Sequence, residues 1–293
     1  MTGMISVITT TYDRADALDA VLRGLSRQSD RDFEVVIADD GSGPATARLI
    51  ADWESRLGVP LRHAWQEHRG FRAAEVRNRA LATSRGRYCI FLDGDCIPRA
   101  DFIAAHRTLA EPGWFVAGNR ILLAAALTER VLRDGLTPET WGFGTFAHHR
   151  LRGDVNRLMP LLRLPAGRWR KMKAQDWRGC RSCNLAVWRS DLERVDGFDA
   201  AYTGWGKEDS DLVVRLLHAG VGRKDGRFAT GVLHLWHPPA ERSDLARNET
   251  RLETTLAGDA LRARCGWSEI GDQGSAGPRA SPAMPACSRS DAR

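Results

Sequence analysis

The sequence lacks a long apolar segment. The longest apolar stretch of the 293-residue chain runs from Ile121 to Leu127, whereas a bilayer span needs ~20 residues. The first residues, MTGMISVITTTYDR, contain no basic segment followed by an apolar one, so they predict no secretory signal. We therefore expect a cytoplasmic protein, with at most peripheral contact to the inner face of a membrane.

Cysteine is also scarce and scattered. Six cysteines lie at positions 89, 96, 180, 183, 265 and 287, and without a secretory signal their thiols are expected to stay reduced. Cys180 and Cys183 form one C-x-x-C pair, but two further zinc ligands at matching spacing are missing. We expect these two cysteines to pack in the core.

Patterns typical of nucleic-acid binding are missing too: there are no heptads, no RNP-like strand and no zinc-finger spacing. We expect no nucleic-acid partner. The formal net charge of +6 and the pI near 9.3 favour other anionic partners, such as phosphates, nucleotides or anionic lipid. The composition, 43% hydrophobic and 27% charged, is ordinary for a globular protein with a sizeable core.

Up to about residue 120, short apolar runs alternate with helical patterns such as residues 15–28. This alternation is typical of βαβ units, and it predicts an α/β fold with a mostly parallel sheet flanked by helices. In such sheets, ligands bind at the carboxyl ends of the strands. The expected strands are Ile5 to Thr10, Phe33 to Ala38, Leu61 to Trp65, Tyr88 to Leu92, Phe115 to Ala117 and, later, Asn184 to Trp188.

Three of these strands end in acidic or aromatic residues, within TTYDR, ADDGSG and DGDC. Residues two apart on an extended chain point the same way, so Asp93 and Asp95 can address one cation or a hydroxyl-rich ligand. Gly94 between them leaves room for close approach. The simpler alternatives are turn formation, and helix capping by Asp13 or Ser42.

The second half of the chain is less regular. The basic segment 150–181 interleaves arginine and lysine with leucine and tryptophan, and is either a solvated face or a surface for an anionic partner. Glu208 and Asp209 lie in the first turn of an expected helix that ends at Gly220. There they either complement the helix dipole or supply a catalytic base. An apolar strand is expected in FATGVLHLWHPP, and residues 268–293 are expected to form a disordered tail.

In this order, the motifs resemble family 2 glycosyltransferases. ISVITTTYDR and VVIADDGSG resemble the first two strands of that family, GRYCIFLDGDC resembles the strand before its D-x-D motif, and GWGKEDSDLVVRLLHAG is similar to the W-G-x-E-D segment of galactosyltransferases and chondroitin-polymerase-like enzymes. The resemblance implies a GT-A fold over residues 1–267, with a nucleotide-binding half (1–120) and a helical or irregular acceptor-binding and catalytic half (121–267).

The resemblance also implies a donor site. Tyr12 would pack against the base, Asp39 or alternatively Asp40 would accept a hydrogen bond from uracil, and Arg77 would approach the base or the pyrophosphate. Asp95 and Asp93 would hold Mn²⁺, or Mg²⁺, together with His234 or else His237. The nucleotide-binding residues implied are Thr10, Thr11, Tyr12, Arg14, Asp39, Asp40, Arg77 and Asp93.

For the acceptor side, the resemblance implies contacts with Trp205, Gly206 and His237, and a catalytic base, Asp209 or else Glu208. The expected reaction is metal-dependent, inverting transfer from a UDP-sugar to a hydroxyl of a glycan or lipid-linked acceptor, in bacterial polysaccharide or lipopolysaccharide synthesis. A nucleotidyltransferase is the rival enzyme, although TTYDRAD lacks its usual Gly-rich phosphate loop. A non-catalytic nucleotide-sugar-binding protein is the other alternative.

Overall fold

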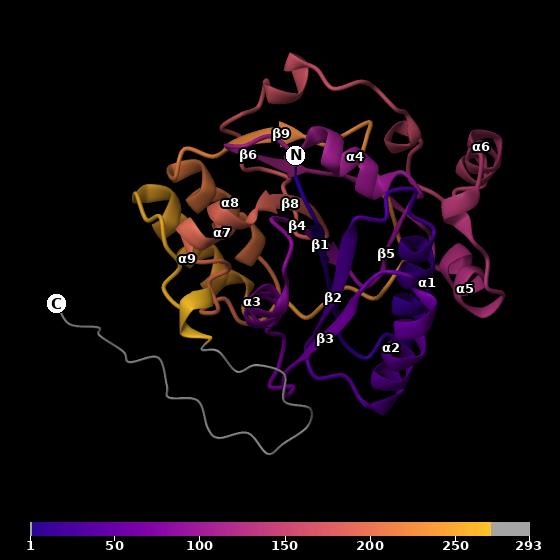
Figure 1. Ribbon diagram of the computed structural model, residues 1–293, viewed down its shortest axis with the longest axis horizontal. Helices are drawn as coiled ribbons and strands as arrows, with labels where there is room; N and C mark the ends of the chain where they lie inside the picture. Colours follow the sequence, from indigo (N-terminus) through magenta and orange to yellow (C-terminus); the bar gives the residue numbers. More distant parts are fainter. Residues whose placement is uncertain (1, 271–293) are drawn as a thin grey trace.

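A seven-stranded sheet forms the centre of the protein, with strand order β3-β2-β1-β4-β8-β6-β9 (Figure 1). The computed structural model describes residues 2–270. Strands β1 to β4 run parallel to one another and β6 runs parallel to β9, whereas β8 runs antiparallel to β4 and β6, so the predicted mostly parallel sheet is confirmed. The strands are β1 (Ile5–Thr11), β2 (Phe33–Asp39), β3 (Leu61–Trp65), β4 (Tyr88–Asp93), β6 (Trp114–Ala117), β8 (Asn184–Trp188) and β9 (Gly222–Asp225).

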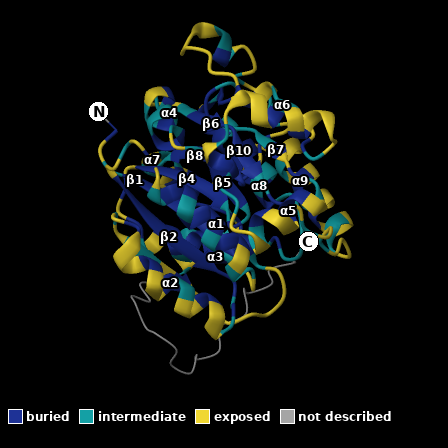
Figure 2. Cartoon of the chain, turned by 90° about the vertical axis from the view of Figure 1, so that its right-hand side faces the viewer, coloured by how far each residue is buried: buried dark blue, intermediate teal, exposed yellow. Residues whose placement is uncertain are grey.

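Helices cover both faces of this sheet. Along β4, Ile90 and Leu92 pack into one core, while Cys89 and Phe91 pack into the other, because alternate side chains of a strand point to opposite faces. The strands are therefore buried on both faces, and exposed residues gather on outer helical turns and loops (Figure 2). That double burial explains the near-continuous apolar runs in the sequence.

Helices α1 (Ala15–Ser26), α2 (Pro44–Arg56), α4 (Phe102–Leu109), α5 (Ala125–Arg133) and α6 (Phe143–Leu151) contribute to the first core. The second core receives α3 (Ala73–Thr83), α7 (Arg189–Val195) and α8 (Glu208–His218), and α9 (Leu245–Ala257) packs against α8. Within residues 2–270, no helix has the length and apolar character that crossing a bilayer requires. Four short 3₁₀ turns complete the described elements: η1 (Pro138–Thr140), η2 (Met159–Leu161), η3 (Arg168–Lys171) and η4 (Trp267–Glu269).

A second, three-stranded sheet connects the two halves of the chain. It is formed by β5 (Cys96–Pro98), β10 (Val232–His234) and β7 (Arg120–Leu122) in the order β5-β10-β7. Of the apolar strand expected in FATGVLHLWHPP, only β10 forms. In the register of this sheet His234 pairs with Cys96, which places the histidine beside the D-x-D motif.

The capping interpretation of Asp13 and Ser42 is wrong. Helix α1 has Arg14 at its N-cap and α2 has Gly43 there, and neither helix start has a side-chain capping hydrogen bond. Instead, the Asp13 backbone N–H donates to Ser42 Oγ (2.9 Å), and Asp13 Oδ1 accepts from the Gly43 N–H (2.8 Å). These bonds join the loops that follow β1 and β2.

The basic segment uses part of its charge inside the fold. Arg163 pairs with Asp101, Lys171 pairs with Glu111 at 2.6 Å, and the buried guanidinium of Arg170 donates to backbone carbonyl oxygens. Burial of Cys180 and Cys183 confirms their expected packing role. Of the predicted disordered tail, Ser268 and Glu269 belong to the turn η4 and Ile270 caps it, and the Ser268 N–H donates to Asp196 (2.8 Å). The remainder lies outside the described residues.

Candidate active site

Two adjoining cavities open at the carboxyl ends of β1, β2 and β4. The smaller measures about 310 Å³ and the larger about 720 Å³. They share the lining residues Phe71, Arg77, Asp93, Trp205, His237 and Ala240. A ligand can therefore extend from one cavity into the other, past Asp93.

The D-x-D motif lies where the two cavities meet. β4 ends at Asp93, and the Gly94 N–H donates to the Thr10 carbonyl oxygen at 2.7 Å. A Cβ on Gly94 would approach that oxygen to 2.8 Å, so a side chain does not fit between the acidic residues without a shift of β1. Glycine therefore lets the chain turn tightly against β1 and directs Asp95 towards β10.

Asp95, His234 and His237 form a cluster able to hold a metal ion. Each offers one ligand atom, and these atoms lie within 4.8 Å of one another. Asp95 Oδ1 is 3.7 Å from His234 Nε2, and Asp95 Oδ2 is 3.4 Å from His237 Nε2. Burial lowers the pKa of His234 and so favours the neutral, metal-binding imidazole. The cluster contains both candidate histidines and not Asp93, which was also predicted as a ligand. One carboxylate with two imidazoles suits a first-row divalent transition-metal ion better than Mg²⁺, which prefers oxygen ligands.

Arg77 connects the acidic groups of the site. From α3, its Nε donates to Thr10 Oγ1 (3.0 Å), Nη1 donates to Glu208 Oε1 (3.0 Å) and Nη2 donates to Asp93 Oδ1 (3.2 Å). Burial raises the pKa of Asp93 and of Glu208, and the arginine opposes both shifts. The resemblance implied that Arg77 approaches the nucleotide, but no sequence pattern indicated its pairing with Glu208.

The two acids at the start of α8 face different surroundings. Both line the larger cavity, but Glu208 is buried against Arg77, whereas Asp209 is half-buried. Asp209 Oδ1 accepts from the Ser210 N–H (2.7 Å), and Oδ2 is 3.4 Å from the Ser182 N–H. Of the two acids, Asp209 is the one that accepts no hydrogen bond from Arg77. It borders the larger cavity, which Asp93 also lines.

The smaller cavity contains most of the predicted nucleotide-binding residues. Its lining includes Thr10, Thr11, Tyr12, Arg14, Asp40, Arg77 and Asp93. Asp39 does not line it: this side chain is fully buried, with Oδ1 accepting from the Ser42 N–H (2.8 Å) and Oδ2 lying 2.9 Å from His63 Nε2. The structure therefore places Asp40 at the pocket and Asp39 beneath it.

Asp40 is held by residues 66–72, the segment between β3 and α3. Its Oδ1 accepts from Gln66 Nε2 (2.6 Å) and Oδ2 from the Arg72 N–H (2.8 Å), and burial raises its pKa. The Tyr12 ring stacks on His68 from the same segment, with ring centroids 4.1 Å apart and planes at 9°. No sequence motif pointed to His68 as a support for Tyr12.

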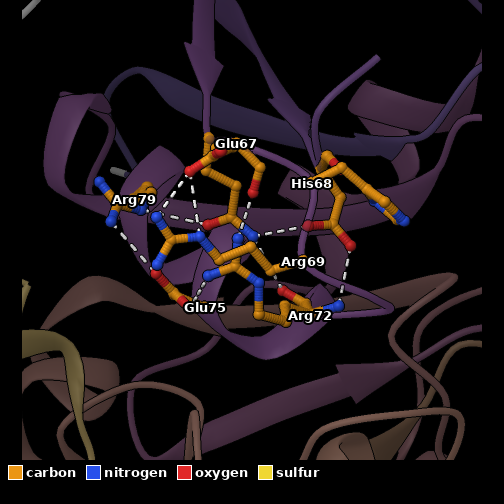
Figure 3. Close-up of polar contacts among 8 residues, drawn as sticks. Glu67, His68, Arg69, Arg72, Glu75 and Arg79 are labelled. Carbon is orange, nitrogen blue, oxygen red and sulfur yellow. Dashed lines mark hydrogen bonds and ion pairs between the residues drawn. The ribbon is translucent and has the colours of Figure 1, made fainter. Parts of the chain in front are cut away.

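Figure 3 shows how ion pairs fix this segment to α3. Glu75 pairs with Arg72 (2.7 Å) and with Arg79 (3.1 Å), and Arg79 Nε donates to Gln66 Oε1 (3.1 Å). His68 Nδ1 lies 3.0 Å from the Asp40 carbonyl oxygen. Contacts with α3 therefore hold both ends of this segment, Gln66 through Arg79 and Arg72 through Glu75.

The predicted acceptor contacts lie at the larger cavity. Trp205, Gly206 and His237 all line it, and Trp205 and His237 also border the smaller one. Gly206 has φ +105°, in a region that residues with a Cβ rarely adopt. Of the residues predicted for the site, Asp39 is the one that faces neither cavity.

A mostly parallel α/β sheet with acids at the carboxyl end of a central strand is the arrangement expected for a GT-A fold, with its ligand site at that edge of the sheet. The model for glycosyl transferase family 2 matches residues 6–152, about half of the chain. The chain therefore belongs to glycosyltransferase family 2. A second family model, described as the N-terminal domain of galactosyltransferase, matches residues 170–237, which include the W-G-x-E-D segment.

Curated relatives and solved structures agree with this assignment. The chain is 28% identical over 250 residues to validoxylamine A glucosyltransferase of Streptomyces hygroscopicus subsp. jinggangensis, covering 78% of this chain and 55% of the relative. It is 26% identical over 235 residues to chondroitin synthase of Escherichia coli, covering 74% and 32%. The chain thus spans about half of the first relative and a third of the second.

The fold is similar to that of a mannosyltransferase from Pyrobaculum calidifontis, solved in complex with GDP-Man and Mn²⁺. The TM-score is 0.59 at 20% identity, and the match covers 86% of this chain and 63% of the other. This similarity confirms the GT-A fold.

Proposed function

We propose that the chain catalyses metal-dependent, inverting transfer of a sugar from a UDP-sugar to a hydroxyl of a glycan or lipid-linked acceptor. The observation that carries this proposal is the cluster of Asp95, His234 and His237 beside a cleft that also contains Asp209. In this proposal, residues 1–120 hold the donor and residues 121–267 supply the acceptor site and base.

Asp95, His234 and His237 would hold Mn²⁺, or Mg²⁺, and when bound the ion stabilises negative charge on the leaving diphosphate. Arg77 keeps Asp93 directed at the junction of the cavities, where Asp93 can contact the ribose or the metal. Asp209 takes the proton of the acceptor hydroxyl as that oxygen attacks the sugar. Direct attack from the face opposite the diphosphate inverts the anomeric carbon.

Asp40 is our candidate for recognition of the base, because it lines the smaller cavity near Tyr12 and Asp39 does not. A carboxylate accepts hydrogen bonds from the N3–H of uracil and equally from the Watson–Crick edge of guanine. The mannosyltransferase of similar fold was solved with GDP-Man, so GDP is the alternative nucleotide to compare with UDP. Because the resemblance of the first two strand ends to family 2 implies a uracil contact, we expect UDP to bind more tightly than GDP.

Thermal unfolding with UDP or GDP, each with Mn²⁺, tests the donor site. At one hundred times its Kd, a ligand stabilises by about 2.7 kcal/mol, which corresponds to a Tm shift of several degrees. We expect Asp95→Asn to abolish the Mn²⁺-dependent part of the UDP shift. Asp52→Asn, on the exposed face of α2, is the matched control and should leave it intact. An unchanged shift in Asp95→Asn would refute the metal assignment.

Product analysis separates the alternatives. A glycosyltransferase releases UDP from a UDP-sugar, a nucleotidyltransferase releases pyrophosphate, and a non-catalytic binding protein shows the thermal shift without release. The anomeric configuration of the new linkage, read by proton NMR, tests inversion. A role in bacterial surface polysaccharide or lipopolysaccharide synthesis at the membrane predicts sedimentation with anionic liposomes at low salt, and no sedimentation would contradict membrane contact.

A further inference from the structure

The larger cavity is rich in positive charge. Its lining contains three carboxylates, Asp93, Glu208 and Asp209, but twice as many cationic side chains. Arg77 already serves Asp93 and Glu208. The other cationic residues of the lining are Arg120, Arg178, Arg181, Lys207 and Arg242.

Three of these five cations form no ion pair with a carboxylate within residues 2–270, although Arg120 lies near enough to Asp93 to help lower the pKa of that carboxyl. Arg178 pairs with Asp176 (3.8 Å) and Lys207 pairs with Glu249 (3.1 Å). Of the three others, Arg120 contacts Cys183 Sγ (3.5 Å) and the Arg242 guanidinium lies 5.0 Å from the centre of the Trp205 ring. The described part of the chain gives the Arg181 side chain no hydrogen bond or ion pair.

The unpaired arginines lie on the acceptor side of the site. Arg120, Arg181 and Arg242 line the larger cavity and not the smaller one, where the nucleotide is proposed to bind. Arg181 directly precedes Ser182, whose N–H faces the proposed base Asp209. An anionic group held by Arg181 would therefore be close to the reacting hydroxyl.

The same wall presents aromatic rings. Trp177, Trp205 and Trp236 line the larger cavity, and Trp236 is about half exposed. Tryptophan offers a large flat apolar face, on which the C–H face of a sugar ring can pack. Arginine is suited to carboxylates and phosphates because its planar guanidinium donates two parallel hydrogen bonds. The donor diphosphate does not explain these cations, because its proposed neutralising partner is the metal at Asp95.

We propose that the acceptor is an anionic saccharide, whose carboxylate or phosphate group is bound by Arg181 and Arg242 while a sugar ring packs on the neighbouring tryptophans. This inference rests on the proposed function and names the substrate class of its acceptor site. Arg181 and Arg242 are then determinants of acceptor specificity and take no part in donor binding.

Matched acceptors test this inference. Uronic-acid-terminated oligosaccharides are compared with their carboxyl-reduced counterparts, and sugar phosphates with the free sugars, using UDP-glucose, UDP-galactose and UDP-N-acetylglucosamine with Mn²⁺ as donors. We expect kcat/KM to be at least tenfold higher for the anionic member of a pair, mainly through KM. The carboxylate and phosphate pairs identify which anion is preferred.

Variants identify the arginines responsible. Arg181→Gln and Arg242→Gln are each expected to reduce the anionic-to-neutral ratio of kcat/KM about tenfold, and added salt should reduce it as well. Arg87→Gln, an exposed arginine next to the amino end of β4, is the matched control and should leave the ratio unchanged. Equal kcat/KM for both members of each pair, or an unchanged ratio in both cavity variants, would overturn the inference.

Binding measured by titration calorimetry separates this inference from the proposed function. If the anionic saccharides bind more tightly than their neutral counterparts and Arg181→Gln removes the difference, the inference holds even if no sugar is transferred. Transfer to neutral acceptors alone would support the proposed function and refute the inference.

Discussion

Replacing Arg77 with methionine should strongly destabilise the protein, because Arg77 is the shared counter-charge of two acids. Its side chain is 4% exposed, and those of its partners Glu208 and Asp93 are 10% and 32% exposed. Removing one member of a buried ion pair costs about 3 to 5 kcal/mol, since the remaining charge is left unpaired. Asp93 is partly screened by water, so we expect about 3 kcal/mol for Arg77→Met near pH 8.

The stability lost in Arg77→Met should be larger at high pH than at low pH. Burial raises the pKa of Asp93 and Glu208, and Arg77 lowers both, so the variant raises both pKa values further. A carboxyl group whose pKa is raised on folding destabilises the fold above its unfolded pKa of about 4, and this cost disappears as the pH falls through the folded pKa. The stability difference between wild type and Arg77→Met should therefore shrink between pH 8 and pH 5.

Urea unfolding followed by tryptophan fluorescence, with EDTA present, measures these differences. Adding Glu208→Gln to Arg77→Met removes one unpaired charge and should restore part of the lost stability. Arg87→Met controls for loss of a surface cation. Three results would contradict the shared role of Arg77: a cost of Arg77→Met below about 1 kcal/mol, the same cost at pH 5, or a double variant no more stable than the single one.

Two further predictions concern the base and the turn in the D-x-D motif. Asp209→Asn should lower kcat by about 10² to 10⁴ with nucleotide affinity retained, because it removes the proton acceptor; steady-state kinetics showing less than a threefold loss would exclude Asp209 as the base. Gly94→Ala should cost about 1 to 3 kcal/mol in urea unfolding, since its Cβ would lie 2.8 Å from the Thr10 carbonyl oxygen. Gly144→Ala, on α6 with no atom within 4 Å of its Cβ, should be neutral or stabilising, and an equal effect of the two substitutions would contradict the steric argument.

Much of the fold was readable along the chain. A strand buried on both faces requires a local run of apolar residues, and the runs at Ile5, Phe33, Leu61 and Tyr88 each start a strand at the expected residue. The two acids of the D-x-D motif were visible in the sequence, but their expected alternation on an extended strand is wrong, because Gly94 and Asp95 lie in the turn between β4 and β5. The helix starting at Glu208 was also visible from its apolar spacing.

The tertiary structure decided which groups meet. Asp39 and Asp40 are neighbours in the sequence, yet the turn after β2 buries one and places the other at the pocket. The hydrogen bond between Arg77 and Glu208 joins residues 131 apart, and β10 brings His234 and His237 to Asp95. Sequence alone determined which chemical groups are available and which local elements carry them. Their partners were set by strand order and helix packing, because contacts between distant residues depend on how the whole chain folds and not on local pattern.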